Sequence, residues 1–491
     1  MPAWKNQLYY GDNLDVLRRH VADESVDLVY LDPPFNSNAD YNVLFAEQDG
    51  TRSAAQIKAF GDTWTWDQAA ARAFEETVEL GGSVSLALQA FRTFLGENDV
   101  LAYLSMMAPR LVELRRVLKD TGSIYLHCDP TASHYLKMLM DAVFGPTTFR
   151  NEVIWWYRKW TKPPQHFLRN HNVLLFYAKG DHNQFNVLSV PLAPSTLRRF
   201  GGKKQKFADE ERTRKVTDDE ESAGAPRPDV WPINLIPAQS AERLGYPTQK
   251  PIRLLEVVIE ASSNPGDVVL DPFCGCGTTL AAAQLLDRRW IGIDITHLAV
   301  NLIRHRMLDT YGTSAEFDVI GEPASLADAQ ALADSDPYQF QWWALGLVGA
   351  RPAEGKKGAD KGIDGRLFFH DPPGSGRTQQ VIISVKAGNT GPAHVRDLRG
   401  VIDREKAAVG VLISMNSPTA PMRSEAASAG FYASEALDRS SHPRLQLLSI
   451  SDLLADKRID LPAGGYGNVT YRKAEAAKAP GPEVDQLTFD D

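Results

Sequence analysis

Short apolar runs alternate with amphipathic stretches along the N-terminal part of the chain. The runs 7–10, 26–31 and 122–127 are apolar and bounded by Gly, Asp or Asn, a pattern typical of buried strands. Between the last two, residues 98–118 carry apolar side chains at helical spacing. Alternation of this kind predicts an α/β fold, with a mostly parallel sheet covered by helices on both faces.

The same alternation resumes in the second half of the chain. Strands are expected over 267–270 and 290–294, and helices over 251–261, 278–286 and 296–308. The two α/β parts are expected to complete one sheet, with the segment between them inserted into it.

Composition favours a soluble protein of several domains. A chain of 491 residues exceeds one ordinary core, and its hydrophobic fraction of 43% is typical of globular proteins. The N-terminus carries no apolar leader and no run is long enough to span a bilayer, so we expect no membrane contact. Three cysteines cannot form a disulfide framework, which fits a reducing cytoplasm.

A glycine-rich turn follows one of the expected strands. Residues 271–277, Asp-Pro-Phe-Cys-Gly-Cys-Gly, lead into a helix that begins near Thr278. Glycines let a ligand approach the backbone, and the helix N-terminus presents free N–H groups. Asp294 ends the next strand at a spacing suited to ribose hydroxyls. We therefore expect a nucleoside-like cofactor here. Cys274 and Cys276 are interpreted as small loop residues, because no Cys or His cluster supports a metal pair.

The tetrapeptide Asp32-Pro33-Pro34-Phe35 follows the strand 26–31, where parallel sheets place their ligands. The exocyclic amine of adenine or cytosine is a poor nucleophile, because its lone pair is conjugated into the ring. A carboxylate and a Pro-constrained carbonyl can both accept from that amine and favour a tetrahedral nitrogen. Phe35 offers a flat apolar face to a base taken out of the helix. A rigid turn is the alternative for the tetrapeptide alone, and the cofactor loop in the same chain favours catalysis.

These blocks resemble the motifs of S-adenosylmethionine-dependent DNA amino-methyltransferases. Residues 271–279 resemble motif I, residues 247–251 (Pro-Thr-Gln-Lys-Pro) resemble motif X at the methionine end of the cofactor, and Gly11-Asp12 resembles the motif that contacts adenine. The order of catalytic motif, target-recognition segment and cofactor loop is that of the β class. The resemblance covers about the first 315 residues and implies a Rossmann-like methyltransferase fold. It implies catalytic roles for Asp32, Pro33, Pro34 and Phe35, and cofactor roles for Asp12, Thr248, Lys250, Asp271, Phe273, Gly275, Gly277, Thr278 and Asp294.

The target base is expected to be adenine. In that family Asp at the first position of the tetrapeptide is more typical of adenine N6, and Ser of cytosine N4. Cytosine-C5 methylation is disfavoured, because its nucleophile lies in a Pro-Cys dipeptide and none occurs here. Methyltransferases acting on RNA or protein usually place the cofactor loop first.

A basic segment separates the two motifs in a chain whose net charge is −9. Thirteen Lys or Arg residues outnumber four acidic residues between Arg158 and Lys215, and aromatic residues precede them. Phosphate neutralisation and base stacking need these residue types. A solvated surface loop is the alternative that charge alone leaves open. The DNA-binding candidates are Arg158, Lys159, Lys162, Arg198, Arg199, Lys203 and Lys204.

A predicted hairpin near the C-terminus joins the strands 366–370 and 381–386. It places Asp364 at the start of one strand and Ser384 and Lys386 on one face of the other. The pattern resembles the Mrr-like branch of the PD-(D/E)xK nucleases, which implies a Mg²⁺ ligand in Asp364 and a catalytic Lys386. Ser384 stands where that family has a second acid or amide, and a hydroxyl is a poorer Mg²⁺ ligand. A degenerate nuclease fold that binds DNA and an ordinary hairpin remain alternatives.

The chain is thus expected to divide into five parts. They are a catalytic half (1–157), a DNA target-recognition insert (158–245), a cofactor-binding half (246–320), a smaller α/β nuclease-like domain (321–465) and a flexible tail (466–491). No role is assigned to residues 40–96.

We expect a site-specific methyltransferase of adenine N6 in double-stranded DNA, and the resemblance suggests a homodimer. With an active nuclease it would be a single-chain restriction–modification protein. The alternatives are cytosine-N4 methylation, or a nuclease or DNA-binding module with vestigial methylation.

Overall fold

The computed structural model describes most of the chain. The described residues are 4–34, 66–159, 165–207, 214–246, 248–353, 362–372, 377–435, 440–462, 470–471 and 473–474. Two expected site residues, Phe35 and Lys162, lie outside them, as does the first part of the unassigned stretch 40–96.

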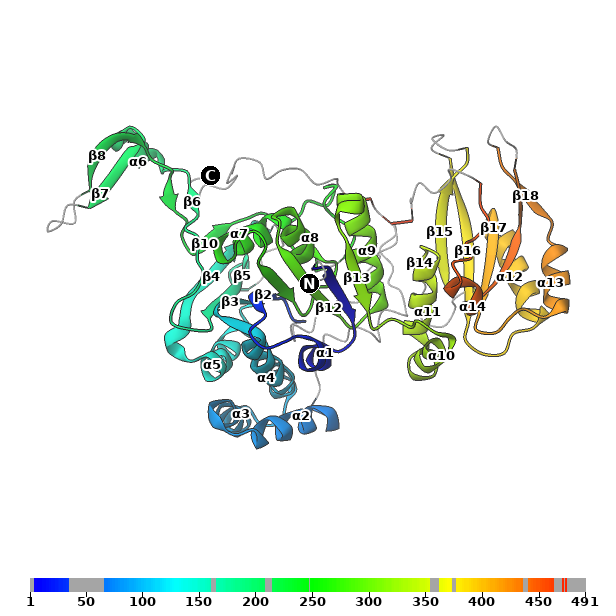
Figure 1. The fold of residues 1–491 in the computed structure, drawn as a ribbon, viewed down its shortest axis with the longest axis horizontal. Coiled ribbons are helices and arrows are strands. Elements are labelled where there is room, and N and C mark those ends of the chain that lie inside the picture. The colour runs from blue at the N-terminus through cyan, green and yellow to red at the C-terminus, as the bar shows by residue number, and fades with distance from the viewer. Residues whose placement is uncertain are drawn as a thin grey trace.

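A nine-stranded sheet forms the centre of the molecule (Figure 1). In order across the sheet its strands are β10 (Val230–Pro232), β4 (Phe149–Trp156), β5 (His171–Ala178), β3 (Leu118–Cys128), β2 (Val26–Leu31), β11 (Val268–Asp271), β12 (Arg289–Asp294), β1 (Asn6–Tyr10) and β13 (Phe317–Ile320). Neighbouring strands pair in parallel, except that β5 runs antiparallel to β3 and β4. The predicted mostly parallel α/β sheet is confirmed.

Helices cover both faces of this sheet. One face carries α1 (Asn13–His20), α4 (Asp99–Val117) and α5 (Ser133–Phe144), and the other carries α7 (Ile252–Ser262), α8 (Thr278–Leu285) and α9 (His297–Tyr311). Successive residues of a strand point to opposite faces, so Leu28 packs in one apolar core and Val29 in the other. Burial on both sides explains why the central strands β2 and β11 are mostly apolar.

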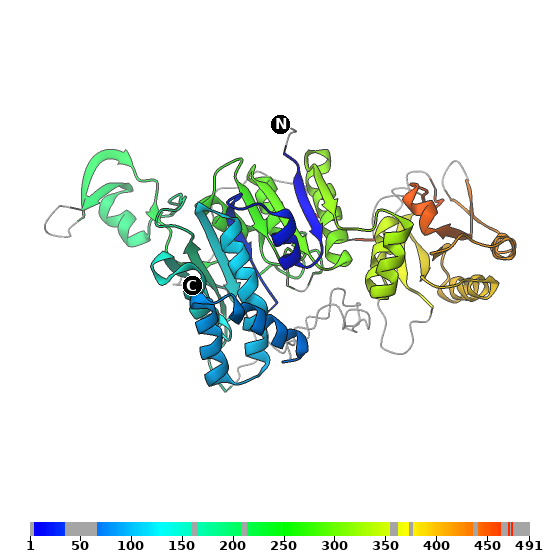
Figure 2. The same cartoon turned by 60° about the horizontal axis from the view of Figure 1, so that its bottom comes forward.

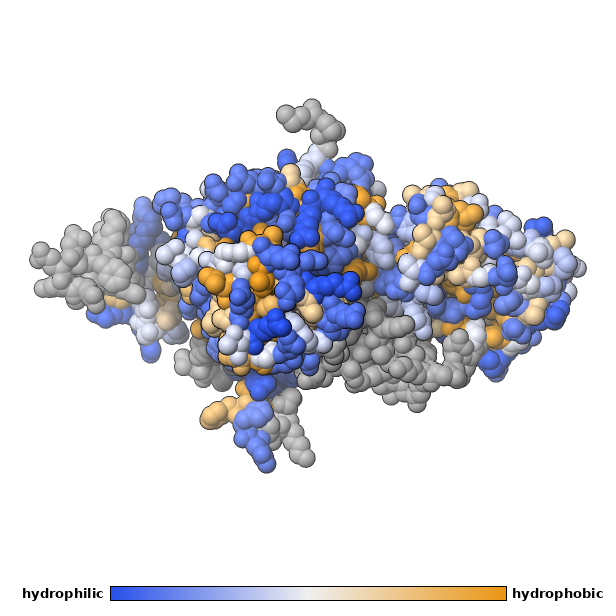
Figure 3. All heavy atoms as spheres, turned by 90° about the horizontal axis from the view of Figure 1, so that it is seen from below, coloured by the Kyte–Doolittle hydropathy of each residue, from blue (hydrophilic) through white to orange (hydrophobic). Residues whose placement is uncertain are grey.

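Two further helices, α2 (Gln68–Glu79) and α3 (Gly82–Leu95), lie outside α4 and form the second part of the unassigned stretch. The surface seen from this side is mostly hydrophilic, with apolar side chains gathered near its middle (Figure 3). Leu86 and Phe94 on α3 and Met138 on α5 are exposed. Within the described ranges, no helix combines the length and the apolar character needed to cross a membrane.

A small arm leaves the sheet between β5 and β10. It contains β6 (Ser189–Val190), α6 (Pro194–Phe200), β7 (Lys203–Phe207), β8 (Arg214–Glu221) and β9 (Ala225–Pro226). The arm projects from one end of the central sheet in both ribbon views (Figures 1 and 2). The predicted insert 158–245 is therefore too wide, because β5 and β10 inside it belong to the central sheet. The run His-Asn-Val-Leu-Leu-Phe-Tyr-Ala of β5 is apolar enough to be buried between helices.

A second α/β unit follows β13. Its sheet has the order β14 (Arg351–Pro352), β15 (Gly365–His370), β16 (Thr378–Lys386), β17 (Val409–Ser414) and β20 (Leu445–Ser449). Around it lie α10 (Leu326–Ser335), α11 (Pro337–Leu347), α12 (Pro392–Glu405), α13 (Ala420–Ala427), α14 (Ile450–Leu454) and the pair β18 (Phe431–Ala433) and β19 (Ser441–Pro443). The predicted hairpin is present as the antiparallel pair β15–β16.

The two units share a small apolar cluster. Trp342 of α11 and Tyr471 pack there with Leu298 of α9, and with Tyr246 and Cys276 from the cofactor loop region. Residues 466–491 were expected to form a flexible tail. Within that range Tyr471 is buried in this cluster and its hydroxyl donates to the carbonyl of Ala350 at 2.9 Å, so here the structure differs from the expectation.

Candidate active site

A cavity of about 530 Å³ opens at the carboxyl edge of the central strands. Because β3, β2, β11, β12 and β1 are parallel neighbours, the loops that follow them meet at this edge. Asp32, Pro33 and Pro34 line one part of the cavity, and the glycine loop after β11 lines another. The volume is that of an ordinary small-molecule site. One cavity therefore joins the two sites that the sequence places far apart.

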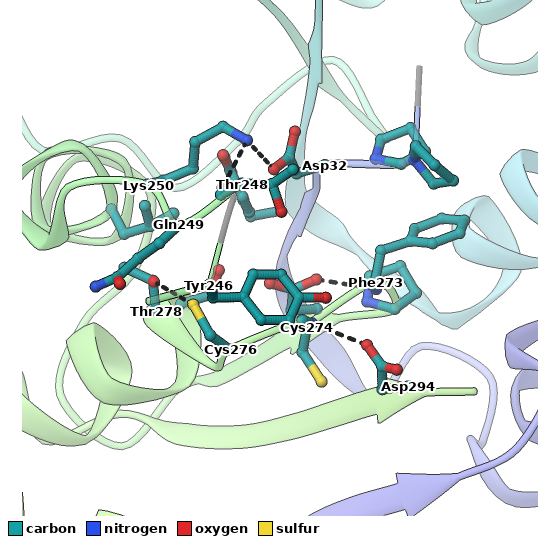
Figure 4. A pocket seen from close by; sticks show the side chains of 18 of the residues that line it. Asp32, Tyr246, Thr248, Gln249, Lys250, Phe273, Cys274, Cys276, Thr278 and Asp294 are labelled. Atoms are coloured by element: carbon teal, nitrogen blue, oxygen red, sulfur yellow. Dashed lines mark hydrogen bonds and ion pairs between the residues drawn. The ribbon is translucent and has the colours of Figure 1, made fainter. Parts of the chain in front are cut away.

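The glycine loop makes a tight turn from β11 into α8. Gly275 and Gly277 both have positive φ angles, of 49° and 72°. A Cβ on Gly275 would lie 3.3 Å from the ring of Tyr246, which crosses the loop (Figure 4), and one on Gly277 would lie 2.9 Å from Ile303. The loop therefore requires glycine at both positions.

Two carboxyl groups at this end of the cavity are buried. Burial raises the pKa of Asp271 to about 7 and that of Asp294 to about 6. Asp271 accepts from the amide of Phe273 at 3.0 Å, and Asp294 accepts from both the amide and the hydroxyl of Thr296. Carboxyl groups with raised pKa values gain from a nearby positive charge, so this end suits a cationic ligand.

The loop after β1 is tied to the glycine loop. Asp12 caps α1 by accepting from the amide of Leu14, and its other oxygen accepts from Arg110 at 2.6 Å. Arg110 also donates to Asn13, whose amide donates to the carbonyl of Pro272 at 2.8 Å. Arg110 lies within α4, and the sequence analysis did not single it out. A lone cation on the apolar face of a helix was the available signal.

Asp32 follows β2, the strand next to β11, and its two carboxylate oxygens have different surroundings. Lys250 donates to its Oδ2 (Figure 4). Its Oδ1 is buried and, among the described residues, has no hydrogen-bond partner. Such an acceptor costs free energy unless a ligand supplies a donor.

The wall behind Asp32 is neutral. The Nδ1 atom of His127 on β3 lies 3.8 Å from Asp32 Oδ1, beyond hydrogen-bond distance. Burial lowers the pKa of His127 to about 3. Its Nε2 accepts from Asn172, so its Nδ1 carries the proton and donates to the hydroxyl of Tyr30 at 2.7 Å. Trp155 packs edge-on against the ring. The sequence analysis did not select His127, although it ends an expected strand at the same edge as Asp32.

The structure brings most of the predicted methyltransferase residues together. The cavity is lined by Asp12, Asp32, Pro33, Pro34, Thr248, Lys250, Asp271, Phe273, Gly275, Thr278 and Asp294. Gly277 is the N-cap of α8 and shapes the loop without lining the cavity. Lys250, expected at the cofactor end, contacts Asp32 instead.

The basic candidates lie outside this cavity. Arg198 and Arg199 are exposed in the last turn of α6, and Lys203 and Lys204 follow on β7. Arg158 and Lys159 are also exposed, directly after β4. The arm and the loop after β4 therefore present positive charge to solvent.

The second unit brings its three candidates into contact. Asp364 Oδ2 accepts from the hydroxyl of Ser384 at 3.0 Å, the amide of Val385 at 2.7 Å and the ammonium of Lys386 at 3.1 Å. Within the described ranges, no group of three or more His, Cys, Asp or Glu residues could hold a metal ion. One carboxylate with a hydroxyl and an ammonium on it is a poor donor set for Mg²⁺. The residues present do not fit the expected Mg²⁺ site.

Two family models match the chain. The model described as DNA methylase (N6_N4_Mtase) matches residues 26–305, and the model described as NACHT-associated inactive Restriction Endonuclease 1 matches residues 338–454. The second match covers the unit that holds Asp364, and agrees with the resemblance to restriction nucleases.

Similar proteins include several DNA methyltransferases. Type II methyltransferase M.EcaI of Enterobacter cloacae is 29% identical over 42% of this chain and 57% of its own length. DNA adenine methyltransferase YhdJ of Escherichia coli is 24% identical over 59% of this chain and 78% of its own length. The structure of PvuII DNA methyltransferase (cytosine-N4-specific) is 16% identical, with a TM-score of 0.37 over 61% of this chain and 86% of that one. The chain spans little more than half the length of several curated relatives, M.EcaI among them.

Proposed function

Since the chain belongs to the N6/N4 DNA methylase family, we propose that it transfers a methyl group from S-adenosylmethionine to the N6 amino group of adenine in double-stranded DNA. The observation that carries the proposal is that Asp32 Oδ1 is buried and lacks a hydrogen-bond partner within the part of the chain that the structure describes, in a cavity that continues to the glycine loop. An exocyclic amine supplies the donor that this oxygen lacks.

The residues at the other end fit the proposed cofactor. The turn at Gly275 leaves room that a Cβ would take, and the buried acids Asp271 and Asp294 suit a positively charged ligand. When bound, S-adenosylmethionine supplies an electrophilic methyl group. Asp12, Thr248 and Phe273 line the same space and would hold it there.

At the base end the chain's own groups prepare the amine. Asp32 Oδ1 accepts one N–H of the target base, which shifts the nitrogen toward the tetrahedral geometry of the transition state. The nitrogen forms its bond to the methyl group as the methyl–sulfur bond breaks, which leaves S-adenosylhomocysteine. The nitrogen gains positive charge, which the carboxylate stabilises, and then releases one proton to solvent. Trp155 and Tyr157 line the cavity and would supply aromatic contacts to a base that has left the helix.

The choice of adenine over cytosine as the target base is a separate part of the proposal. Asp at position 32 favours adenine within this family, and the relatives include enzymes named for both bases. The exposed Arg198, Arg199 and Lys204 would contact the DNA backbone. The homodimer stays a prediction.

The test is mass spectrometry of nucleosides from unmethylated duplex DNA incubated with the protein and S-adenosylmethionine. We expect N6-methyladenine from the natural chain and none from Asp32→Ala. Asp141→Ala is the matched control, because Asp141 is also a partly buried carboxylate paired with a lysine but lies on α5 outside the cavity.

N4-methylcytosine would keep the reaction and overturn the choice of base. Equal methylation by Asp32→Ala would overturn the role of Asp32. A natural chain that binds cofactor and methylates no base would overturn the proposed function and favour a DNA-binding module with vestigial methylation.

A further inference from the structure

Lys250 joins the cofactor region to the catalytic carboxylate. Its ammonium donates to Asp32 Oδ2 and to the carbonyl of Thr248 at 3.3 Å. Both side chains of the pair are mostly buried, with 13% of Lys250 and 17% of Asp32 exposed. Figure 4 shows the ammonium of Lys250 reaching from its loop to Asp32.

This contact decides which oxygen of Asp32 faces the ligand. A carboxylate has two equivalent oxygens, and its last torsion is broad and easily turned. Lys250 holds Oδ2, so Oδ1 is the oxygen without a hydrogen-bond partner among the described residues. Release of Lys250 would let the group rotate and offer the base a poorly placed acceptor.

Other titratable groups face Asp32 from the neighbouring strands. His127 from β3 is neutral because burial lowers its pKa, Tyr30 from β2 has a raised pKa, and Asp271 ends β11. Among the described residues, Lys250 is the cation that pairs with Asp32. Removing it would leave a mostly buried carboxylate near a second acid.

We infer that Lys250 is a positioning residue for methyl transfer, which holds Asp32 Oδ2 so that Oδ1 accepts from the target amine. This inference rests on the proposed function. It changes the role that the sequence motif implied, because Lys250 then serves the base end of the cavity more than the cofactor.

A double-mutant cycle tests the contact without any activity. The melting temperature is measured for the natural chain, Asp32→Asn, Lys250→Met and the double variant. Each single change should lower it, and the double change should lower it by clearly less than the sum. Additive shifts would overturn the inference, because the two groups would then be independent. Lys179→Met is the matched control. Lys179 is also mostly buried, with 11% of its side chain exposed, and forms an ion pair with Glu24, but neither residue lines the cavity.

Kinetics separates positioning from cofactor binding. Lys250→Met should lower kcat by about 10- to 100-fold and leave the Kd for S-adenosylhomocysteine within about twofold of the natural value. Lys250→Arg keeps a cation at this position and should recover much of kcat.

The opposite pattern overturns the inference. A weaker Kd with unchanged kcat at saturation would make Lys250 a cofactor ligand. If the natural chain methylates no base, the proposed function fails, and the double-mutant cycle still decides whether Lys250 holds Asp32.

Discussion

The amide of Gly275 donates to Asp294 Oδ2 at 3.0 Å, across 19 residues of sequence. The acid that was expected to bind ribose hydroxyls therefore also holds the glycine loop in place. Its other oxygen accepts twice from Thr296, so one carboxylate fixes the loop and the start of α9 together. The side chain that was expected to recognise the cofactor thus also sets the shape of the loop.

The two buried acids make stability depend on pH. An unfolded Asp has a pKa near 3.8, while burial raises that of Asp271 to about 7, so between these values the folded state binds more protons. The stability contributed by the protonated form is present below about pH 4 and lost as the pH rises through about 7.

Asp271→Asn keeps an acceptor for Phe273 and cannot ionise. Its melting temperature without cofactor should fall less than that of the natural chain between about pH 4 and 8. Parallel curves in differential scanning fluorimetry would contradict this.

The cluster around Tyr471 should brace the cofactor loop from the C-terminal side. Tyr471→Ala removes a buried ring and should cost about 3 kcal/mol of unfolding free energy. Tyr471→Phe loses only the hydrogen bond to Ala350 and should cost about 1 kcal/mol. Denaturant titration measures both. S-adenosylhomocysteine should bind more weakly to the Ala variant, because Cys276 and Tyr246 share the cluster. Unchanged stability in the Ala variant would show that this segment does not dock in solution.

The arm should contribute positive charge to DNA binding and should leave the affinity for the cofactor unchanged. Replacing Arg198 and Arg199 by Gln removes two candidate phosphate contacts. The slope of log K against log salt should fall by about 2 in magnitude, with cofactor affinity unchanged. The control is a second pair of consecutive exposed arginines, Arg18 and Arg19 on α1, both changed to Gln. Equal slopes for the two double variants would exclude the arm as a phosphate-binding surface.

The second unit should not cut DNA. Its candidate site offers one carboxylate, and the hydroxyl and ammonium of Ser384 and Lys386 already donate to it. Supercoiled plasmid incubated with Mg²⁺ should remain intact, with the natural chain and Lys386→Ala alike. Nicking by the natural chain that disappears in Lys386→Ala would restore the nuclease hypothesis.

The central strands and both methyltransferase motifs were predictable because their signals are local. Buried strands in a parallel sheet are mostly apolar, as β2 and β11 are apart from Asp27 and Asp271, and the glycine loop carries its own conformational requirement. Contacts across the sheet were not predictable. Whether Lys250 reaches the cofactor or Asp32 depends on how motif X crosses the cavity, which spacing along the chain does not encode.

Two errors came from reading composition over a wide window. The charged residues between Arg158 and Lys215 obscured the apolar run of β5, a strand that packs against α5. The polar composition after residue 466 likewise concealed Tyr471, a single aromatic residue whose partners lie on α9 and α11. Tertiary packing decides such segments, and local pattern does not record it.

The position of β1 has a consequence for how the protein is made. Residues 6–10 leave the ribosome long before the residues that pair with them in the sheet, 291–294 and 317–320. Until those strands are synthesised, Leu8 has no core to enter and the cavity lacks the wall that Gly11 and Asp12 provide. Pairing over such a separation is slow and leaves apolar edges open to chaperones. The methylase part therefore matures as one piece, and a nascent chain stalled within the arm would hold Asp32 but no place for a methyl donor.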